Sequence, residues 1–167
     1  MKRLFDLILV TILIMILLVP MLFIMLAIRL TSKGPVLYWS DRVGFAHSIY
    51  KMPKFRSMRI DTPEVATHLM SNPEEFLSPI GRFLRRTSLD ELPQLFSILK
   101  GDMSFVGPRP ALFNQDDLID LRLENDLDKL IPGLTGWAQV NGRDELSIPE
   151  KVLLEVEYMQ KKHFGLI

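Results

Sequence analysis

Two adjacent carboxylates, Asp90 and Glu91, are the residues of this 167-residue sequence best suited to chemistry. Three arginines precede them within about two helical turns, namely Arg82, Arg85 and Arg86. Carboxylates bind divalent cations such as Mg²⁺, and arginines offset the charge of phosphate oxygens, so this combination is typical of a diphosphate site. The same cations could also be ordinary salt-bridge partners.

The carboxylate pair also has a structural interpretation. Residues 88–91, Ser-Leu-Asp-Glu, match a capping box, in which a serine and a glutamate bond to the first backbone amides of a helix. Alternatively, Asp90 itself is the N-cap, which places Pro93 in the first turn, where proline is harmless. On this segment alone, capping is the commoner role of such a pair.

Further cations stand apart from the pair in sequence. Arg109 lies between Pro108 and Pro110, and the two prolines restrict the backbone around it, which would fix the direction of its guanidinium. A planar guanidinium held in place suits a pair of phosphate oxygens. Lys54 belongs to a basic stretch over residues 51–59, which is either a solvated strand edge or an arm that faces phosphates or lipid headgroups.

The segment 132–143 combines three glycines with a proline, a composition typical of tight turns close to a ligand or to another segment. Its polar side chains Gln139, Asn141 and Arg143 are candidate contacts to a sugar or a base. Trp137 fits either a core position or an anchor at a membrane interface.

The elements that must position these residues begin with an apolar run from Leu4 to Leu30, interrupted only by Asp6 and Arg29. At about 1.5 Å per residue, a helix of this length could cross a hydrocarbon core of roughly 30 Å. The run is too long for a cleaved signal peptide, and no small-x-small cleavage site follows it. We therefore expect a membrane helix.

Pro20 lies near the middle of this run, where it removes a backbone hydrogen bond and favours a bend. Both flanks are basic, with Lys2 and Arg3 before the run and Arg29 and Lys33 after it, so the positive-inside rule gives no orientation. A re-entrant helix that bends at Pro20 and returns to the same face explains both features. A kinked helix that crosses the membrane explains the proline equally well.

The remaining elements are short. Residues 36–40 and 48–55 predict a β-hairpin. A helix with one apolar face is predicted from the spacing of Leu89, Leu92, Leu95, Phe96 and Leu99. Residues 114–129 and 149–162 predict further helices, the last one amphipathic. The expected fold class is α+β, mainly helical, with a membrane helix over 1–33 and a second domain over 34–167.

The composition excludes several classes of function. Lysine plus arginine and aspartate plus glutamate both total 20, so the chain lacks the basic field of a nucleic-acid-binding protein. The absence of cysteine excludes disulfides, thiolate metal sites and a cysteine nucleophile. The three histidines are too scattered for the spacing of a paired metal site.

In combination, these motifs resemble the bacterial sugar transferase family, the small monotopic phosphoglycosyl transferases that begin glycoconjugate assembly. The matching residues run in family order over nearly the whole chain: Lys2, Arg3 and Asp6; 34–36; Arg42 and Gly44; 54–58; Arg85; 88–95; 100–104; 106–110; and 132–140.

The resemblance implies a re-entrant helix bent at Pro20 in the bacterial inner membrane, interfacial amphipathic helices and a catalytic domain over residues 34–167 on the cytoplasmic face. It also implies a two-step reaction. Asp90 would attack the β-phosphate of a UDP-sugar and release UMP, and polyprenyl phosphate, such as undecaprenyl phosphate, would then take the phosphosugar from Asp90. A carboxylate nucleophile divides a displacement between two anions into two easier steps.

The resemblance also assigns roles to other residues. Glu91 would help to hold Mg²⁺, and Lys54, Arg85 and Arg109 would contact phosphates. The implied partners are the UDP-sugar, the polyprenyl phosphate, the lipid bilayer and downstream glycosyltransferases. Which sugar is transferred does not follow from the residues.

Two departures from the family pattern qualify this expectation. Val19 stands before Pro20 where members usually carry serine, so a hydroxyl that could bond a freed carbonyl is missing. Members commonly continue with further interfacial helix, so we expect a truncated form or reduced membrane docking. Two other functions fit the sequence less well. The intact residues Asp90, Glu91 and Arg109 argue against a non-enzymatic membrane-anchored partner. A metal-dependent phosphohydrolase would not explain the long apolar segment.

Overall fold

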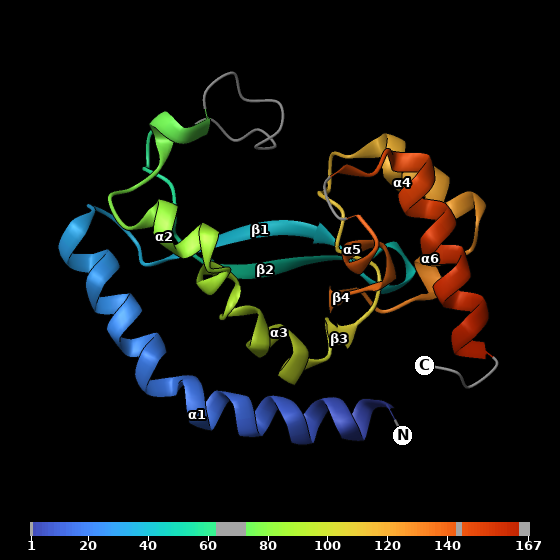
Figure 1. Cartoon of the computed structure of the whole chain (residues 1–167), viewed down its shortest axis with the longest axis horizontal. Helices are drawn as coiled ribbons and strands as arrows, with labels where there is room; N and C mark the ends of the chain where they lie inside the picture. Colours follow the sequence, from blue (N-terminus) through green and yellow to red (C-terminus); the bar gives the residue numbers. More distant parts are fainter. Residues whose placement is uncertain (1, 63–72, 143–144, 164–167) are drawn as a thin grey trace.

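The structure is a computed structural model that describes residues 2–62, 73–142 and 145–163 (Figure 1). Its helices and strands, in chain order, are α1 (Lys2–Thr31), β1 (Leu37–Val43), η1 (Phe45–His47), β2 (Ile49–Phe55), η3 (Pro73–Phe76), α2 (Gly81–Arg86), η4 (Leu89–Glu91), α3 (Gln94–Lys100), β3 (Ser104–Val106), α4 (Asp116–Glu124), η5 (Leu127–Lys129), β4 (Gly133–Thr135), α5 (Trp137–Val140) and α6 (Ile148–His163). The predicted α+β, mainly helical fold class is confirmed.

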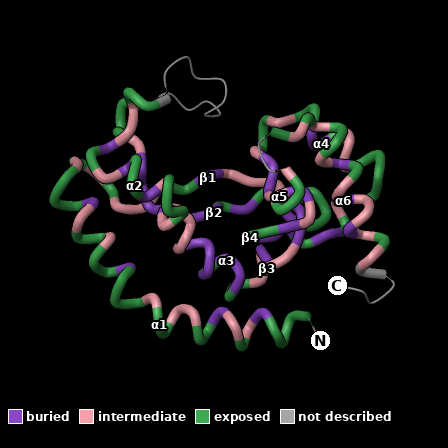
Figure 2. Tube along the Cα trace, in the orientation of Figure 1, coloured by how far each residue is buried: buried purple, intermediate pink, exposed green. Residues whose placement is uncertain are grey.

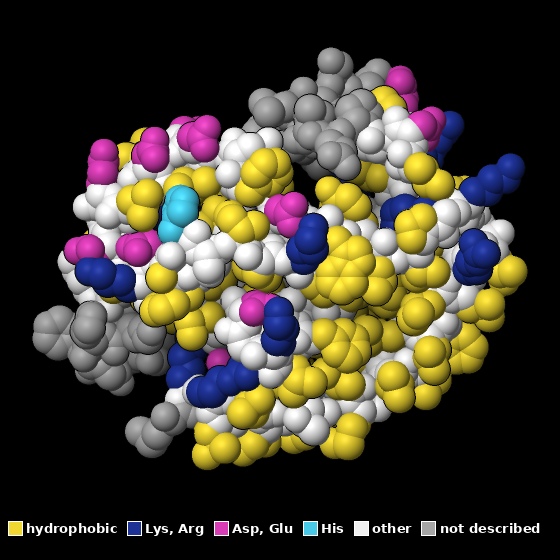
Figure 3. All heavy atoms as spheres, turned by 180° about the vertical axis from the view of Figure 1, so that it is seen from behind, with side chains coloured by type: hydrophobic (Ala, Val, Ile, Leu, Met, Phe, Trp, Pro, Cys, Tyr) yellow, Lys and Arg dark blue, Asp and Glu magenta, His cyan; other side chains and the backbone are white. Residues whose placement is uncertain are grey.

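The apolar N-terminal run forms the single continuous helix α1, which contains Pro20 and is visibly bent (Figure 1). Within the described residues it is the one helix that is long and apolar enough to cross a membrane. Most of its apolar side chains face outward, and Figure 3 shows them as a band of hydrophobic atoms along one side of the molecule.

Both halves of α1 pack against the same folded body. In the first half, Val10 is fully buried in a cluster with Met52 and Ile98. In the second half, Ile28 is fully buried in another cluster with Phe55 and Leu84. The partly buried Leu17 touches both clusters, so the helix follows the body along its length instead of leaving it.

Polar ties hold the two ends of α1. The buried carboxylate of Asp6 accepts a hydrogen bond from the Ser104 hydroxyl at 2.8 Å, close to the start of the helix. Just past the other end, the guanidinium of Arg56 donates to the Ser32 hydroxyl at 2.6 Å. The few polar groups next to this apolar helix therefore serve to dock it.

The folded body against which α1 packs contains two small sheets. Strands β1 and β2 form the predicted antiparallel hairpin, in which Leu37 pairs with Phe55 and Val43 with Ile49. Strands β3 and β4 pair in parallel, with Ser104 opposite Gly133. Figure 2 shows that buried residues concentrate along β2 and α3, so these two elements form a packed support for the polar side chains next to them.

The predicted helix through Leu89 and Leu99 is interrupted. The chain forms the short 3₁₀ turn η4, and α3 begins only after Pro93. Ser88 has a φ of 56°, a left-handed conformation that ends α2 and starts a new direction. The predicted apolar face is buried only in part, because Leu95 is 3% exposed whereas Phe96 and Leu99 are 45% and 41% exposed.

Candidate active site

The carboxylate pair lies in η4, between α2 and α3 and against strand β2. Neither Ser88 nor Pro93, the residues that precede η4 and α3, makes a side-chain capping hydrogen bond. The capping-box interpretation is therefore wrong, and the alternative of Asp90 as N-cap is wrong too, because Pro93 holds that position for α3. The two carboxylates are left for other contacts.

Glu91 is held by two cations from distant parts of the chain. Its Oε1 accepts from Nζ of Lys54 on β2 at 2.9 Å and from Nη2 of Arg109 at 2.7 Å. The side chains of Glu91 and Lys54 are only 15% and 17% exposed. Burial would raise the pKa of Glu91, but the charges and hydrogen bonds of Lys54 and Arg109 outweigh it and lower the pKa to about 2. Glu91 is therefore ionised at neutral pH.

Asp90 behaves differently, although it is the neighbouring residue. Its side chain is 8% exposed. Burial raises the pKa of Asp90, and the negative charge of Glu91 adds to that effect, while Lys54 and Arg85 oppose it. Adjacent carboxylates with pKa values driven in opposite directions are typical of groups that have different roles in one site.

Two further arginines surround the pair. Arg85 on α2 donates from Nε to the Ser57 hydroxyl at 3.0 Å, and its charge acts on Asp90. Arg42 on β1 lies within electrostatic range of Arg109 and Glu91, and burial followed by the charge of Arg109 lowers the pKa of Arg42. The group therefore combines four cations with two carboxylates.

The segment around Arg109 runs beside the glycine-rich segment, as its composition predicted. A Cβ on Gly133 would lie 2.1 Å from the backbone nitrogen of Gly107, and a Cβ on Gly136 would lie 2.1 Å from the Gly107 carbonyl oxygen. Only glycine permits this approach. The close contact sets residues 107–110 and 133–136 side by side, with Arg109 on one and Thr135 on the other.

A pocket of about 330 Å³ opens at this junction. Its polar lining residues are Glu91, Arg109, Gln139, Ser88 and Thr135, and its apolar lining residues are Leu92, Leu95 and Leu134. A concave site with both charged and apolar lining residues suits a ligand that carries both phosphate and hydrocarbon.

The structure thus brings together most of the residues singled out from the sequence. Lys54, Arg109 and Glu91 are in direct contact, Asp90 and Arg85 lie next to them, and Gln139 lines the pocket with its amide toward the Leu134 carbonyl. Arg143 lies outside the described residues.

Arg42 was not predicted as part of the site, although it belongs to a recognisable motif. Thr135 and Leu134 were also missed. Their signal was present in the glycine-rich segment, but the sequence could not show which side chains of that segment face the pocket.

Asp90 and Glu91 are the carboxylates of this site that the Mg²⁺ prediction concerns. Among the described residues, no cluster of three or more aspartate, glutamate, histidine or cysteine side chains could hold a metal. Mg²⁺ commonly keeps several waters and binds through one or two carboxylates together with substrate phosphates. Asp90 and Glu91 fit that mode, because Lys54 and Arg109 both contact the same oxygen of Glu91, Oε1.

Comparison with known proteins agrees with this geometry. The sequence pattern described as bacterial sugar transferase matches residues 1–166 of the chain. The chain belongs to the bacterial sugar transferase family. This match covers α1, the hairpin and all of the site, so the family assignment does not rest on a single motif.

Several relatives are similar over most of the chain. An undecaprenyl-phosphate glucose phosphotransferase of Komagataeibacter xylinus is 40% identical over 95% of this chain and 32% of its own length. A UDP-glucose:undecaprenyl-phosphate glucose-1-phosphate transferase of Escherichia coli is 39% identical over 94% of this chain and 34% of its own. The chain spans about a third of the length of these two. An uncharacterized sugar transferase EpsL of Bacillus subtilis is 39% identical over 99% of this chain and 80% of its own length.

Proposed function

We propose that this protein transfers a sugar 1-phosphate from a UDP-sugar to a polyprenyl phosphate, through a phosphosugar held covalently on Asp90. The observation that carries the proposal is the dyad itself. A buried carboxylate with a raised pKa, Asp90, stands next to a second carboxylate, Glu91, that Lys54 and Arg109 keep ionised, and Glu91 lines a pocket with both polar and apolar residues in its wall. Relatives named as sugar phosphotransferases support it.

In the first step, a carboxylate oxygen of Asp90 attacks the β-phosphorus of the UDP-sugar. The bond between that phosphorus and the bridging oxygen breaks, and UMP leaves with the electron pair. In the second step, a phosphate oxygen of the polyprenyl phosphate attacks the same phosphorus, and the Asp90 carboxylate is released. Each step exchanges one P–O bond for another, and the nucleophile in each is already an anion.

The surrounding charges suit such anions. Lys54, Arg85, Arg109 and Arg42 outnumber the two carboxylates by two positive charges, so the group retains attraction for phosphate after its internal ion pairs have formed. Arg109 and Gln139 line the pocket, which supports the proposal that both contact the substrate. Arg143, outside the described residues, remains a predicted sugar contact.

Mg²⁺ is the proposed cofactor. Glu91, with Asp90 beside it, would hold the ion, which when bound supplies charge neutralisation at the diphosphate. The protein's own part is to keep Glu91 ionised, which Lys54 and Arg109 do by their direct contacts.

We further propose that α1 is re-entrant in the bacterial inner membrane, so that its ends and the domain of residues 34–167 share the cytoplasmic face. Both halves of α1 pack on one body, and Lys2 and Ser32 near its two ends bond to groups of that body. A straight helix of 30 residues would span about 45 Å and carry one end away from it. The outward apolar band would face lipid.

The proposal is tested by incubating detergent-solubilised protein with a panel of UDP-sugars, Mg²⁺ and undecaprenyl phosphate, and by measuring UMP release. We expect release for at least one donor, and a loss on the order of 10³-fold or more for Asp90→Asn, since a nucleophile is removed without a change of shape. A phosphosugar adduct on Asp90 should be detectable by mass spectrometry when the acceptor is left out. Wild-type turnover in Asp90→Asn would show that the mechanism is wrong.

A further inference from the structure

The backbone next to Arg109 is tied down at four consecutive carbonyls. Those of residues 108–111 accept, in chain order, from the amide of Gly133 at 2.8 Å, Nη2 of Arg122 at 2.9 Å, Nη1 of Arg42 at 3.1 Å and the amide of Val43 at 3.1 Å. Pro108 and Pro110 have no N–H, so the hydrogen bonds available to this segment are mainly those of its carbonyls. Three different elements hold the segment.

The donor to the carbonyl of Arg109 itself is Arg122, which comes from α4. A glutamate on α6, Glu155, fixes the direction of that guanidinium. Nε of Arg122 donates to Oε2 of Glu155 at 2.8 Å, and Nη2 donates to Oε1 at 2.5 Å. The two side chains are 13% and 5% exposed. A bidentate pair fixes the plane of the guanidinium, and the same Nη2 reaches the Arg109 carbonyl.

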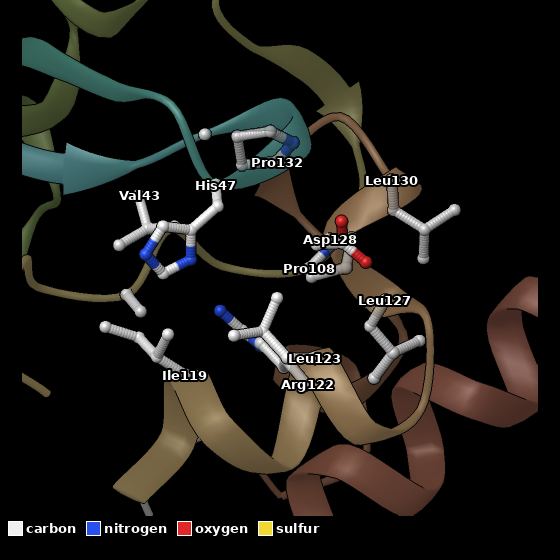
Figure 4. A pocket seen from close by; sticks show the side chains of 12 residues that line it. Val43, His47, Pro108, Ile119, Arg122, Leu123, Leu127, Asp128, Leu130 and Pro132 are labelled. Atoms are coloured by element: carbon white, nitrogen blue, oxygen red, sulfur yellow. The ribbon is translucent and has the colours of Figure 1, made fainter. Parts of the chain in front are cut away.

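Arg122 also lines a small cavity of about 30 Å³ that has Pro108 among its walls. In Figure 4, Arg122 and Leu123 extend from α4 into this space, and Pro108 and Pro132 border it. A cavity of this size has room for about one water.

The packing of α4 on α6 does not depend on this ion pair. The two helices share an apolar cluster that includes Leu118, Ile119, Val152 and Tyr158. A buried ion pair contributes little stability compared with apolar residues of similar volume, so its presence here calls for another explanation. The hydrogen bond from Arg122 to the carbonyl of Arg109 supplies this explanation.

We infer that Arg122, oriented by Glu155, is a positioning residue that fixes the backbone of Arg109 and so directs the Arg109 guanidinium to Glu91 and to the substrate phosphate. The inference rests on the proposed function, because Arg109 acts on phosphate only in that reaction. It connects the α4–α6 layer, which lies away from η4 in Figure 1, to the dyad through the series Glu155, Arg122, Arg109 and Glu91.

The test replaces both charges together, since removal of one would leave the other buried and unpaired. In the double variant Arg122→Met with Glu155→Leu, the protein should fold, and kcat/KM for UMP release should fall by about 10- to 100-fold, the loss expected from a misplaced catalytic group. The matched control is Val152→Ala, which weakens the same α4–α6 contact but leaves the hydrogen bond to Arg109 in place. It should lower Tm without a comparable loss of kcat/KM.

A double-mutant cycle identifies the route of the effect. If Arg122 acts through Arg109, the paired substitution should cause no further loss in an Arg109→Ala background, whereas Val152→Ala should have the same small effect in both backgrounds. Full additivity of the paired substitution with Arg109→Ala would overturn the inference. So would wild-type kcat/KM in the double variant.

Hydrogen exchange separates this inference from the proposed function. The backbone amides of peptides that cover residues 107–112 should exchange faster in the double variant than in the wild type. In Val152→Ala their exchange rate should be unchanged. The measurement requires no substrate. If exchange is faster in the double variant but the wild-type protein releases no UMP from any donor, the positioning role is supported and the proposed reaction is refuted. Unchanged exchange in the double variant would refute the positioning role even if the reaction is right.

Discussion

The helix α1 and the dyad site use charged residues in opposite ways. At the start of α1, Lys2 donates to the Val106 carbonyl at 2.5 Å, Arg3 donates to the Ile98 carbonyl at 2.6 Å, and Asp6 accepts from Ser104. Each of these charges is directed at a neutral group of the protein. They dock the helix to the folded body.

In the dyad site, by contrast, charged side chains form ion pairs with one another, and positive charges are in excess. Glu91 takes two cations at Oε1, while Asp90 lies beside it with a raised pKa. The comparison shows that a charged residue next to an apolar surface can be structural. A cluster of charged side chains with an excess of positive charge, held by buried elements, indicates instead a negatively charged ligand. The following predictions test this division of roles.

The largest expected effect concerns the placement of α1. The natural sequence has no cysteine, so single cysteines at Lys2 and Lys33 can be labelled without background. Because both ends of α1 contact the same body, we expect both positions to react with an impermeant maleimide only when the cytoplasmic face is accessible. Labelling from opposite faces would establish a helix that crosses the membrane.

The next largest effect is expected at Glu91. Glu91→Gln keeps the shape but leaves Lys54 and Arg109 against a neutral amide, so kcat/KM for UMP release should fall by about 100-fold. Glu150→Gln, an exposed carboxylate on α6, is the matched control and should keep wild-type turnover. A Glu91→Gln protein within twofold of wild type would remove Glu91 from the mechanism.

These two regions were also predictable to different extents. The apolar run, the bend-forming Pro20 and the hairpin follow from composition and spacing, because their causes are local. The break at Ser88 and the exposure of Phe96 and Leu99 were not predictable in this way. They depend on a left-handed backbone angle and on the packing of α3 against α1, both of which are set by tertiary contacts.

The site shows the same division. Asp90, Glu91 and the arginine between two prolines were recognisable as residue types in a pattern. That Lys54 and Arg109 share one oxygen of Glu91, 37 and 18 positions away along the chain, could not be read from spacing. Arg42 and Arg122 were harder still, because each reaches the segment of Arg109 through a backbone carbonyl, which carries no sequence signal.

A smaller effect is expected for the docking of α1. Asp6→Ala removes the acceptor of the buried Ser104 hydroxyl and of the Phe105 amide, so the free energy of unfolding should fall by about 1–3 kcal/mol. Thr11→Ala on the same helix removes only an exposed local bond to the Leu7 carbonyl and should change stability by less than about 0.5 kcal/mol. Denaturant titration in detergent measures both. Equal losses of unfolding free energy in the two variants would show that Asp6 does not dock α1.

The smallest effect, and the most specific to the dyad, is a shift in pH dependence. Asp90 must be ionised to attack phosphorus, and burial together with the charge of Glu91 raises the pKa of Asp90. Turnover should therefore fall on the acid side at a pH above the ordinary range of an aspartate, as Asp90 gains its proton. Glu91, with a pKa of about 2, should add no second step in that range.

Arg85 lowers the pKa of Asp90 through its charge, so Arg85→Gln should move the midpoint of the acid limb to higher pH. The loss of a phosphate contact would reduce the plateau rate in the same variant, but it would not move the midpoint of kcat/KM, which reports the free enzyme. Arg82→Gln, a neighbouring exposed arginine paired with Glu74, should change neither the plateau nor the midpoint. An acid limb that stays in place in Arg85→Gln would show that the limb belongs to a group other than Asp90, and the assignment of the nucleophile would then rest on the covalent adduct alone.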